Sequence, residues 1–486
     1  MRDSKLIALL KSFSPAEFRD FEKFVSSPYF SKGRDLVPFF KALKPFYPDF
    51  ENEILNAENV FRKLFPGREY DKVKSANIIK TLSSQMFMAC KNFLTQLGLQ
   101  EDEFRKQFYL INELRKRKLY TEFEKDHKSI GRTADDPFKG TVRDFVDRYF
   151  TELLARDYSL DKDDFRNSYE ANLKSAEYSL LAGLINTFKH QDEKNIARAY
   201  NLQVRDNLLD AMLDNLDADG LIARLRETSH PMNDYLEIYF LIYRMNKAPY
   251  DTSLFYKARN LLQERRELFG QTENYTLWNT LLSFCNIANL PSDEHFYIFN
   301  HILDNGIYRK SDSEDFHIVL FRNIVLVASA MKKTEWLENF LGKYSDEIHA
   351  DHRTDMRLYS YAALNFLKGE YSAALGLIQK IRFELFLYKP DMRVLQLKIF
   401  YKLGYTDQLF SMIDSTIHYL RNTKEIRDDF KESVKNLTKY LKEFIKMNEG
   451  RTSRKDIDLL KKRVKEEPYL GQRNWLLEEA DLLEGK

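Results

Sequence analysis

Apolar residues recur at helical spacing along most of the chain. One line of apolar side chains at steps of three or four runs through residues 71–97 and comprises Ile79, Leu82, Met86, Cys90, Phe93 and Leu97. This period places them on one face of an α-helix, which Gly98 is expected to end. We interpret Cys90 as a core residue, because buried thiols usually pack as small apolar groups.

Shorter helices are predicted before this long one. Residues 14–17 (SPAE) form a capping box with proline at the first helical position, and an apolar period follows them as far as Pro28. Further short helices are predicted over residues 35–43 and 57–65. After the long helix, the charge-rich residues 104–130 predict another helical pair.

The segment GRTADDPFKGT at residues 131–141 interrupts this pattern. It combines glycine, proline and two adjacent aspartates without any apolar period, which is typical of a boundary or an exposed loop. Beyond it, helices are predicted around 145–153, 176–188 and 196–216. We divide the chain into an N-terminal helical module (1–130), connecting helices (142–230), helical repeats (231–450) and C-terminal capping helices (451–486).

Helices in the second half of the chain pair at a regular spacing. Pairs are predicted to start near residues 232, 274, 313, 354 and 390, and a long helix is predicted from about 424. A period of roughly 34 to 42 residues is typical of a helical array, in which no pair can bury its apolar face alone.

The clearest internal similarity lies where second helices of these pairs begin, in residues 333–348, 369–381 and 404–417. In the middle copy Gly369 suits a tight turn, Tyr371 can wedge between two helices, and Ala374 permits their close approach. This G-x-Y-x-x-A-L pattern resembles the tetratricopeptide repeat. The other copies depart from the pattern at Thr334 and Leu409, and the proline of that repeat is missing after residue 381.

The resemblance covers about residues 230–450 and implies the fold class. It implies an all-α protein whose antiparallel helix pairs stack into a right-handed α-solenoid, preceded here by the N-terminal helical module. The whole chain also resembles a group of bacterial helical-repeat proteins, through LLKSFSPAEFRDFEKFV near its start and NWLLEEADLL near its end. That second resemblance implies no activity, but it indicates that the helix over 474–483 caps the array.

Composition and charge exclude several classes of protein. Of 486 residues, 43% are hydrophobic and 14% aromatic, which excludes a disordered chain, and the 16 glycines and 12 prolines are too few for an all-β fold. A net charge of +2 argues against general attraction to nucleic acid or acidic membranes. Two cysteines and the lack of a long apolar run predict a cytoplasmic protein without a disulfide scaffold or a membrane partner.

The sequence offers no motif for catalysis or for binding a nucleotide, so we assign no catalytic, cofactor-binding or metal-binding residue. The most metal-like stretch is His349–Asp355, which we interpret as a polar inter-helix loop in which Asp351 or Thr354 caps the next helix. Basic clusters at 115–118 and 461–465 could contact phosphate. Acidic neighbours favour the alternative of a solvated helix face with ion pairs.

Tyrosine and lysine mark a candidate binding surface. When the tetratricopeptide pattern is carried over, it implies that Tyr359, Lys398, Tyr401 and Lys402 face a concave groove. Lysine would pair with carboxylates and tyrosine would supply flat apolar contact, so an extended peptide or an acidic tail is the expected ligand. Most tyrosines of this class pack between helices instead, and that interpretation stays open.

Three functions remain compatible with the sequence. The first is a non-catalytic scaffold that binds a protein or peptide on the concave face of the array. The second is a nucleic-acid-associated regulatory protein that docks through the N-terminal module. The third is an enzyme without a recognisable motif, for which no residue argues positively.

Overall fold

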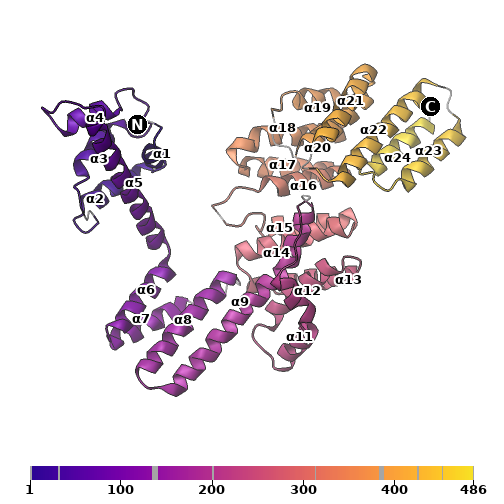
Figure 1. The fold of residues 1–486 in the computed structure, drawn as a ribbon. Helices are drawn as coiled ribbons and strands as arrows, with labels where there is room; N and C mark the ends of the chain where they lie inside the picture. The colour runs from indigo at the N-terminus through magenta and orange to yellow at the C-terminus, as the bar shows by residue number, and fades with distance from the viewer. Residues whose placement is uncertain are drawn as a thin grey trace. The chain divides into compact units, whose positions relative to one another are not determined.

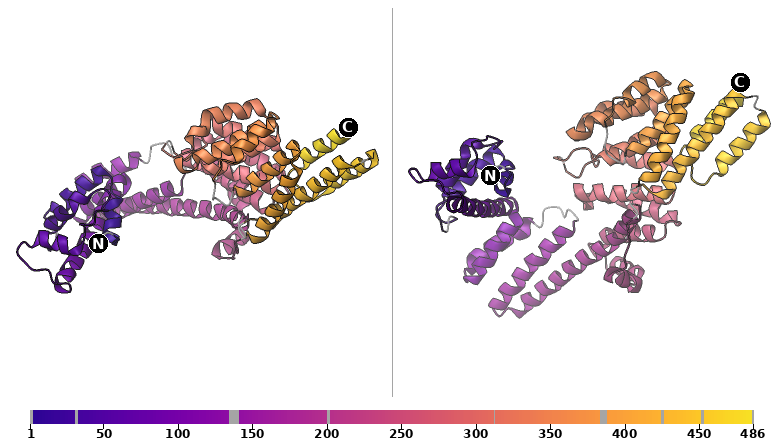
Figure 2. Two further views of the ribbon diagram at one scale, coloured as in Figure 1. Left: turned by 90° about the horizontal axis from the view of Figure 1, so that it is seen from above. Right: turned by 45° about the horizontal axis from the view of Figure 1, so that its top comes forward.

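The chain is all-helical in the computed structural model (Figures 1 and 2). The model describes residues 3–30, 33–133, 141–199, 202–311, 313–382, 388–423, 426–450 and 453–484. These residues form 24 α-helices and no β-strand, apart from one isolated bridge between Phe316 and Ile348. The predicted all-α class is therefore confirmed.

The chain divides into two compact units. Unit 1 comprises Met1–Thr133 and Leu154–Ser168, and unit 2 comprises Ala134–Leu153 and Tyr169–Lys486. The end predicted for the N-terminal module, residue 130, lies close to the end of the first segment of unit 1. The predicted loop at 131–141 lies largely outside the described residues.

Unit 1 is built around one long helix, α5 (Lys74–Glu101). Helices α1 (Lys5–Lys11), α2 (Pro15–Ser26) and α4 (Ala57–Leu64) contact α5, and α3 (Val37–Leu43) contacts α2 and α4. The capping box at the start of α2 is formed as predicted, with both reciprocal hydrogen bonds between Ser14 and Glu17.

The core of unit 1 is rich in phenylalanine. Phe93 on α5 lies against Phe13 and Phe21, with ring centroids 5.6 and 5.4 Å apart. Cys90 is fully buried in the same cluster, which confirms its predicted place on the apolar face.

One predicted helix end in unit 1 is wrong. Helix α5 continues through Gly98 to Glu101, because the turn after Gly98 stays right-handed and Asp102 supplies the next helix start. The Asp102 side chain accepts a hydrogen bond from the backbone N–H of Arg105, and α6 (Glu103–Lys116) begins there. Helices α6 and α7 (Tyr120–Thr133) form the helical pair predicted over 104–130.

Unit 2 contains the predicted series of helix pairs. The first helices of the pairs begin at Asn233, Gln271, Ile318, Ala350 and Lys389, close to the predicted starts near 232, 274, 313, 354 and 390. The pairs are α12 (Asn233–Lys247) with α13 (Thr252–Glu264), α14 (Gln271–Ile287) with α15 (Ser292–Asp304), α16 (Ile318–Ala330) with α17 (Thr334–Tyr344), α18 (Ala350–Leu367) with α19 (Tyr371–Ile378), and α20 (Lys389–Leu403) with α21 (Thr406–Asn422). Three more helices follow, namely α22 (Asp428–Glu449), α23 (Arg454–Glu466) and α24 (Arg473–Glu484).

These pairs pack in chain order. The second helix of each pair contacts the first helix of the next, from α13 with α14 through to α21 with α22. First helices of neighbouring pairs also contact one another at α12–α14, α16–α18 and α18–α20. One apolar core runs through the pairs from α12 as far as α20, and a second one, formed by residues of α20 to α24, adjoins it. Each pair thus covers the apolar face that its neighbour exposes.

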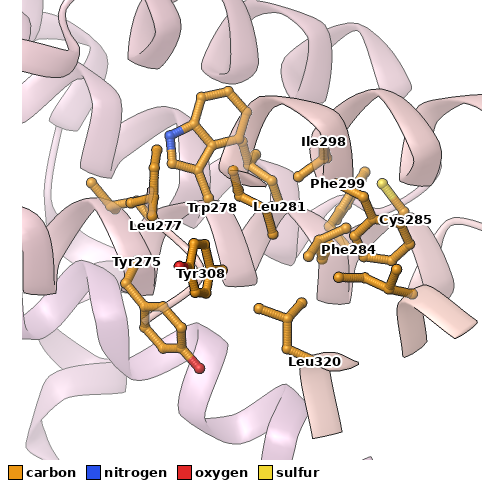
Figure 3. Close-up of a cluster of buried hydrophobic side chains, with 14 of the residues drawn as sticks. Tyr275, Leu277, Trp278, Leu281, Phe284, Cys285, Ile298, Phe299, Tyr308 and Leu320 are labelled. Carbon is orange, nitrogen blue, oxygen red and sulfur yellow. The ribbon is translucent and has the colours of Figure 1, made fainter. Parts of the chain in front are cut away.

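Helix α14 shows how completely these faces are buried (Figure 3). Trp278, Leu281 and Cys285 lie along α14 at helical spacing, and each is fully buried against side chains of α15 and α16. The Trp278 ring lies over the His301 ring, with 4.1 Å between their centroids.

In the turn between α18 and α19, Gly369 and Ala374 have the roles expected from the sequence, a tight turn and a close approach of helices. Gly369 has a φ of +81°, a left-handed conformation that glycine adopts without strain, and Gly404 has a φ of +69° at the end of α20. Ala374 on α19 has no exposed surface, so a larger side chain would separate α19 from its neighbours.

Residues 142–230, for which connecting helices were predicted, differ in part from the prediction. Helices α8 (Val142–Asp161) and α9 (Phe165–Ala199) precede two short ones, α10 (Leu208–Asn215) and α11 (Ala218–Glu227). The single helix predicted over 196–216 is wrong, because residues 202–207 are not helical and Asn207 starts α10 with a capping box to Asp210.

We predict that Trp278→Ala lowers the free energy of unfolding by about 3–5 kcal/mol, because it opens a cavity in the packed core. Urea denaturation followed by circular dichroism at 222 nm measures this loss. Tyr250→Ala is the matched control, since Tyr250 is 89% exposed and its removal should change stability by less than about 0.5 kcal/mol. Equal effects of the two substitutions would contradict the packing described here.

Candidate binding surface on α20

Three of the four residues predicted to face a groove lie together on helix α20. Lys398, Tyr401 and Lys402 occupy its C-terminal half at spacings of one, three and four residues. Tyr359 lies on α18 instead, is only 4% exposed, and faces Asp391 near the start of α20. We use the name α20 surface for Lys398, Tyr401 and Lys402 together with Phe366 and Lys332, which lie beside them.

The last helix of the chain covers the α20 surface. The carboxylate of Glu479 on α24 lies 2.5 Å from the Lys402 ammonium group, and Glu478 lies 2.6 Å from that of Lys332. The Trp475 ring of α24 meets the Tyr401 ring edge-on, with 5.7 Å between centroids. The predicted groove residues therefore contact a segment of their own chain.

Of the three lysines of the α20 surface, Lys398 has the surroundings that stabilise its positive charge least. Its ammonium group lies 4.8 Å from the centroid of the Phe366 ring and 4.9 Å from that of Trp475, and it donates a hydrogen bond of 3.1 Å to the side-chain oxygen of Gln472. No carboxylate in the described part of the chain lies within ion-pair distance of Lys398. Burial lowers the pKa of Lys398 to about 8; Glu478 and Glu479 oppose this shift, and Lys402 and Lys332 add to it.

A buried ion pair joins two of the first helices nearby, α16 and α20. Arg322 on α16 donates a hydrogen bond to Asp391 at the start of α20, where Asp391 is 8% exposed. Burial raises the pKa of Asp391, and Arg322 opposes the shift. Burial also raises the pKa of the Tyr359 hydroxyl beside this pair. The pair fixes how α16 and α20 meet, and Tyr359 belongs to its packing.

Helix α9 covers the first two pairs as α24 covers the α20 surface. Lys189 of α9 lies 2.5 Å from the Glu273 carboxylate of α14, which also accepts a hydrogen bond from the Tyr239 hydroxyl of α12. Asp192 accepts a hydrogen bond of 2.9 Å from Thr280, and burial raises its pKa. These polar side chains connect α9 to α12 and α14, with Glu273 paired to Lys189 and Asp192 hydrogen-bonded to Thr280.

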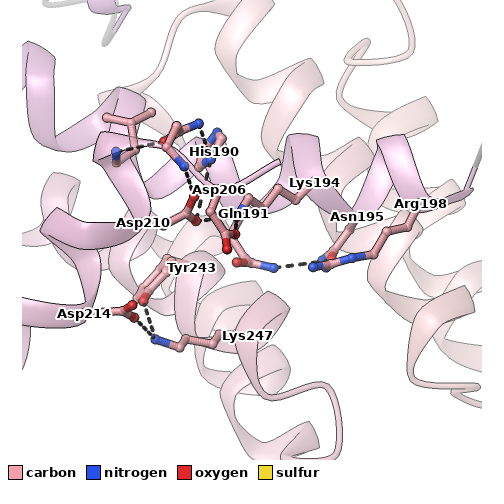
Figure 4. A network of polar contacts seen from close by, with 12 residues as sticks. His190, Gln191, Lys194, Asn195, Arg198, Asp206, Asp210, Asp214, Tyr243 and Lys247 are labelled. Carbon is pink, nitrogen blue, oxygen red and sulfur yellow. Dashed lines mark hydrogen bonds and ion pairs between the residues drawn. The ribbon is translucent and has the colours of Figure 1, made fainter. Parts of the chain in front are cut away.

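A second polar network joins α9 to α10 and α12 (Figure 4). Lys194 of α9 donates hydrogen bonds to Asp206 and Asp210, and the Lys194 contact lowers the pKa of Asp210. Lys247 of α12 lies 3.4 Å from Asp214 and 3.1 Å from the Tyr243 hydroxyl. The network consists of paired charges, so it holds the short helix α10 in place.

An open hollow of about 490 Å³ lies between α11, α12 and α13. Buried apolar side chains, including Ile222, Phe240 and Leu254, form its floor. Its rim carries two ion pairs between α11 and α12, Arg226 with Glu237 and Arg244 with Asp219. These rim charges neutralise one another, so the hollow offers shape and apolar contact rather than an activated acid or base.

The metal-like stretch at 349–355 forms the start of α18. The His349 side chain caps the helix by accepting a hydrogen bond from the backbone N–H of Asp351, whereas the sequence had suggested Asp351 or Thr354 for this role. Asp355 accepts a hydrogen bond from the backbone N–H of Arg382. In the described ranges, no three His, Cys, Asp or Glu side chains are placed to hold a metal ion.

Both basic clusters carry ion pairs on helix faces. Arg115 lies 3.0 Å from Asp161, and Lys116 lies 2.8 Å from Glu113. In the C-terminal cluster, Lys461 lies 2.5 Å from Asp481 and Arg463 lies 2.6 Å from Glu443. Carboxylates of the same chain thus occupy the positions that phosphate groups would need.

The two thiols are not activated nucleophiles. Burial raises the pKa of both Cys90 and Cys285 to about 12, so both remain protonated at neutral pH. No helix in the described part of the chain combines the length and apolar character needed to cross a lipid bilayer.

The residues that sequence reasoning missed are those of α24. The segment NWLLEEADLL was interpreted as a cap, yet Trp475, Glu478 and Glu479 contact the α20 surface directly. The mixture of apolar and acidic residues in this segment could have indicated these contacts, since its acidic residues complement the lysines of α20. No family model, curated protein or solved structure matches the chain.

We predict that Lys398→Met raises the free energy of unfolding by about 1–2 kcal/mol at pH 7, because it removes a poorly compensated buried charge. This advantage should shrink between pH 8 and pH 10. In that range the native protein, with its lowered lysine pKa, binds fewer protons than the unfolded chain, so raising the pH stabilises the unsubstituted protein. Urea denaturation at pH 7, 8, 9 and 10 tests this, and a constant difference would contradict it.

We predict that Asp391→Leu lowers the free energy of unfolding by about 3–5 kcal/mol, because it leaves the Arg322 guanidinium buried without a partner. The double variant Arg322→Met with Asp391→Leu should recover most of this loss. Denaturation of the single and double variants, each compared with the unsubstituted protein, measures the coupling. Additive losses would show that the two side chains act independently.

Proposed function

We propose that residues 231–450 form a tetratricopeptide-like, right-handed α-solenoid and that the chain is a non-catalytic scaffold for a protein or peptide. The observation that carries the proposal is the packing of successive helix pairs in chain order. Arrays of this kind present extended surfaces along their first helices, and repeat proteins bind partners on such surfaces.

The chemistry of the α20 surface supports a protein ligand of acidic character. The α20 surface presents the ammonium groups of Lys332, Lys398 and Lys402 beside the rings of Phe366 and Tyr401, and α24 adds the Trp475 ring. Lysine beside tyrosine suits carboxylates on an amphipathic segment, and α24 is such a segment. We further propose a cytoplasmic location, which the two unpaired cysteines favour, and kinship with the bacterial helical-repeat proteins noted above.

The other two functions have less support. A nucleic-acid-associated role would need free cations in the N-terminal module, whereas Arg115, Lys116 and Arg117 all pair with carboxylates. An enzymatic role would need an activated acid, base or nucleophile. Of the buried titratable groups described above, Lys398 has a lowered pKa but lies under α24 against Gln472, and the others are paired or hydrogen-bonded within the fold or, like the thiols, fully protonated.

We predict that the tagged full-length chain recovers a stoichiometric protein partner from native lysate and co-elutes with it in size-exclusion chromatography. Lys462→Glu, an exposed change on α23, should retain the partner. Ala374→Leu, which forces α18 and α19 apart, should reduce recovery at least about threefold while the chain stays helical by circular dichroism. Recovery of no stoichiometric partner by any of these baits would overturn the proposed scaffold.

A further inference from the structure

The α20 surface holds one more positive charge than its occupant can neutralise. Lys332 and Lys402 each meet a carboxylate of α24, at 2.6 and 2.5 Å. Lys398, which lies between them and the Trp475 ring, meets only the neutral amide of Gln472. An ammonium group largely removed from water is best stabilised by a carboxylate, so this contact is incomplete.

We propose that the α20 surface is a docking site for an acidic amphipathic helix of a protein partner, and that α24 occupies this site in the free chain. The inference rests on the proposed scaffold function. The partner helix carries an aromatic residue at the position of Trp475 and carboxylates three and four residues after it, as α24 does. It differs from α24 by a third carboxylate three residues before the aromatic residue, at the position of Gln472.

The three positions form one recognition face through their observed contacts. Trp475 and Glu479 lie four residues apart on one face of α24 (Arg473–Glu484), and Gln472 directly precedes the helix, where its backbone carbonyl accepts a hydrogen bond from the backbone N–H of Leu476. Their observed contacts agree, since Gln472 meets Lys398, Trp475 meets Tyr401, and Glu479 meets Lys402. A glutamate at position 472 would give Lys398 the carboxylate that it lacks.

Helix α24 is built in a way that permits exchange. It has 12 residues, a length at which an isolated helix is marginal in water. Its fully buried apolar side chains, Leu476 and Ala480, belong to the cluster that α24 forms with α22 and α23, and Trp475, Leu477 and Leu483 pack against the same cluster. Exchange therefore requires α24 to leave α22 and α23 as well as α20, a local opening that costs less than unfolding of the whole unit.

The first test measures the opening of α24 in the full-length chain. We expect Gln472→Glu to slow hydrogen exchange of α24 amides by about tenfold, as a charge-assisted hydrogen bond to Lys398 forms. In a chain that also carries Lys398→Met, the same substitution should give no slowing. Gln408→Glu on α21 is the matched control. Equal slowing with and without Lys398 would overturn the assignment of this contact.

The second test measures docking between molecules. A fluorescent peptide of residues 470–486 is titrated with the full-length chain carrying Glu479→Lys. This substitution places the new ammonium group against that of Lys402, and their repulsion is expected to release α24. We expect this variant to bind the peptide at least about tenfold more tightly than the unsubstituted chain or the Glu466→Lys control does. A peptide carrying Gln472→Glu should bind roughly tenfold more tightly again, and Lys402→Met added to the released chain, which removes the ammonium group that meets the peptide carboxylate, should weaken binding at least about tenfold.

The outcomes separate this inference from the scaffold itself. Peptide binding that is equal in the released and control chains, or absent from the released chain although it stays helical, would overturn the docking site. If the lysate partner is nevertheless recovered, the scaffold function stands and its surface lies elsewhere. If the peptide docks as expected and no partner is recovered, the docking site stands and the scaffold proposal fails.

Discussion

Each helix pair of unit 2 is apolar on more than one side, and this single constraint accounts for most of the structure. A pair in isolation would leave large apolar areas in water, so it is stable only when a neighbour covers them. The pairs therefore pack in chain order, and residues such as Trp278 and Ala374 are fully buried within the array. Ala374 is as decisive as Trp278, because close approach of two helices needs a small residue as much as packing needs a large one.

The outer faces of the first helices must also be covered, but here the covering helices use ion pairs as well as apolar contacts. Helix α9 covers α12 and α14, and α24 covers α20, yet both interfaces mix apolar contact with ion pairs such as Lys189–Glu273 and Lys402–Glu479. Charges that leave water require partners of opposite sign. Lys189 and Lys402 have such partners, and Lys398 has a neutral amide and two aromatic rings instead. This difference sets the α20 surface apart from the interface under α9.

Local chemistry could be predicted from the sequence where one residue decides the outcome. The capping box at Ser14 and Glu17, the core position of Cys90 and the left-handed turn at Gly369 all follow from short-range geometry. Prediction failed where two local signals compete. Glycine at 98 suggested a helix end, but a glycine can also remain helical, and the cap formed by Asp102 determines the boundary instead.

The sequence by itself determined that this protein is helical, where its helix pairs begin, and which residue types line α20. These properties follow from the 3.6-residue period and from capping, which act over a few residues. Only the tertiary structure decided that Tyr359 is buried beside Arg322 and Asp391 and that α24 lies over Lys398 and Lys402. The physical reason is that ion pairs and ring contacts between residues some 70 positions apart depend on how whole helices pack. A pattern within a few residues of the sequence does not contain this information.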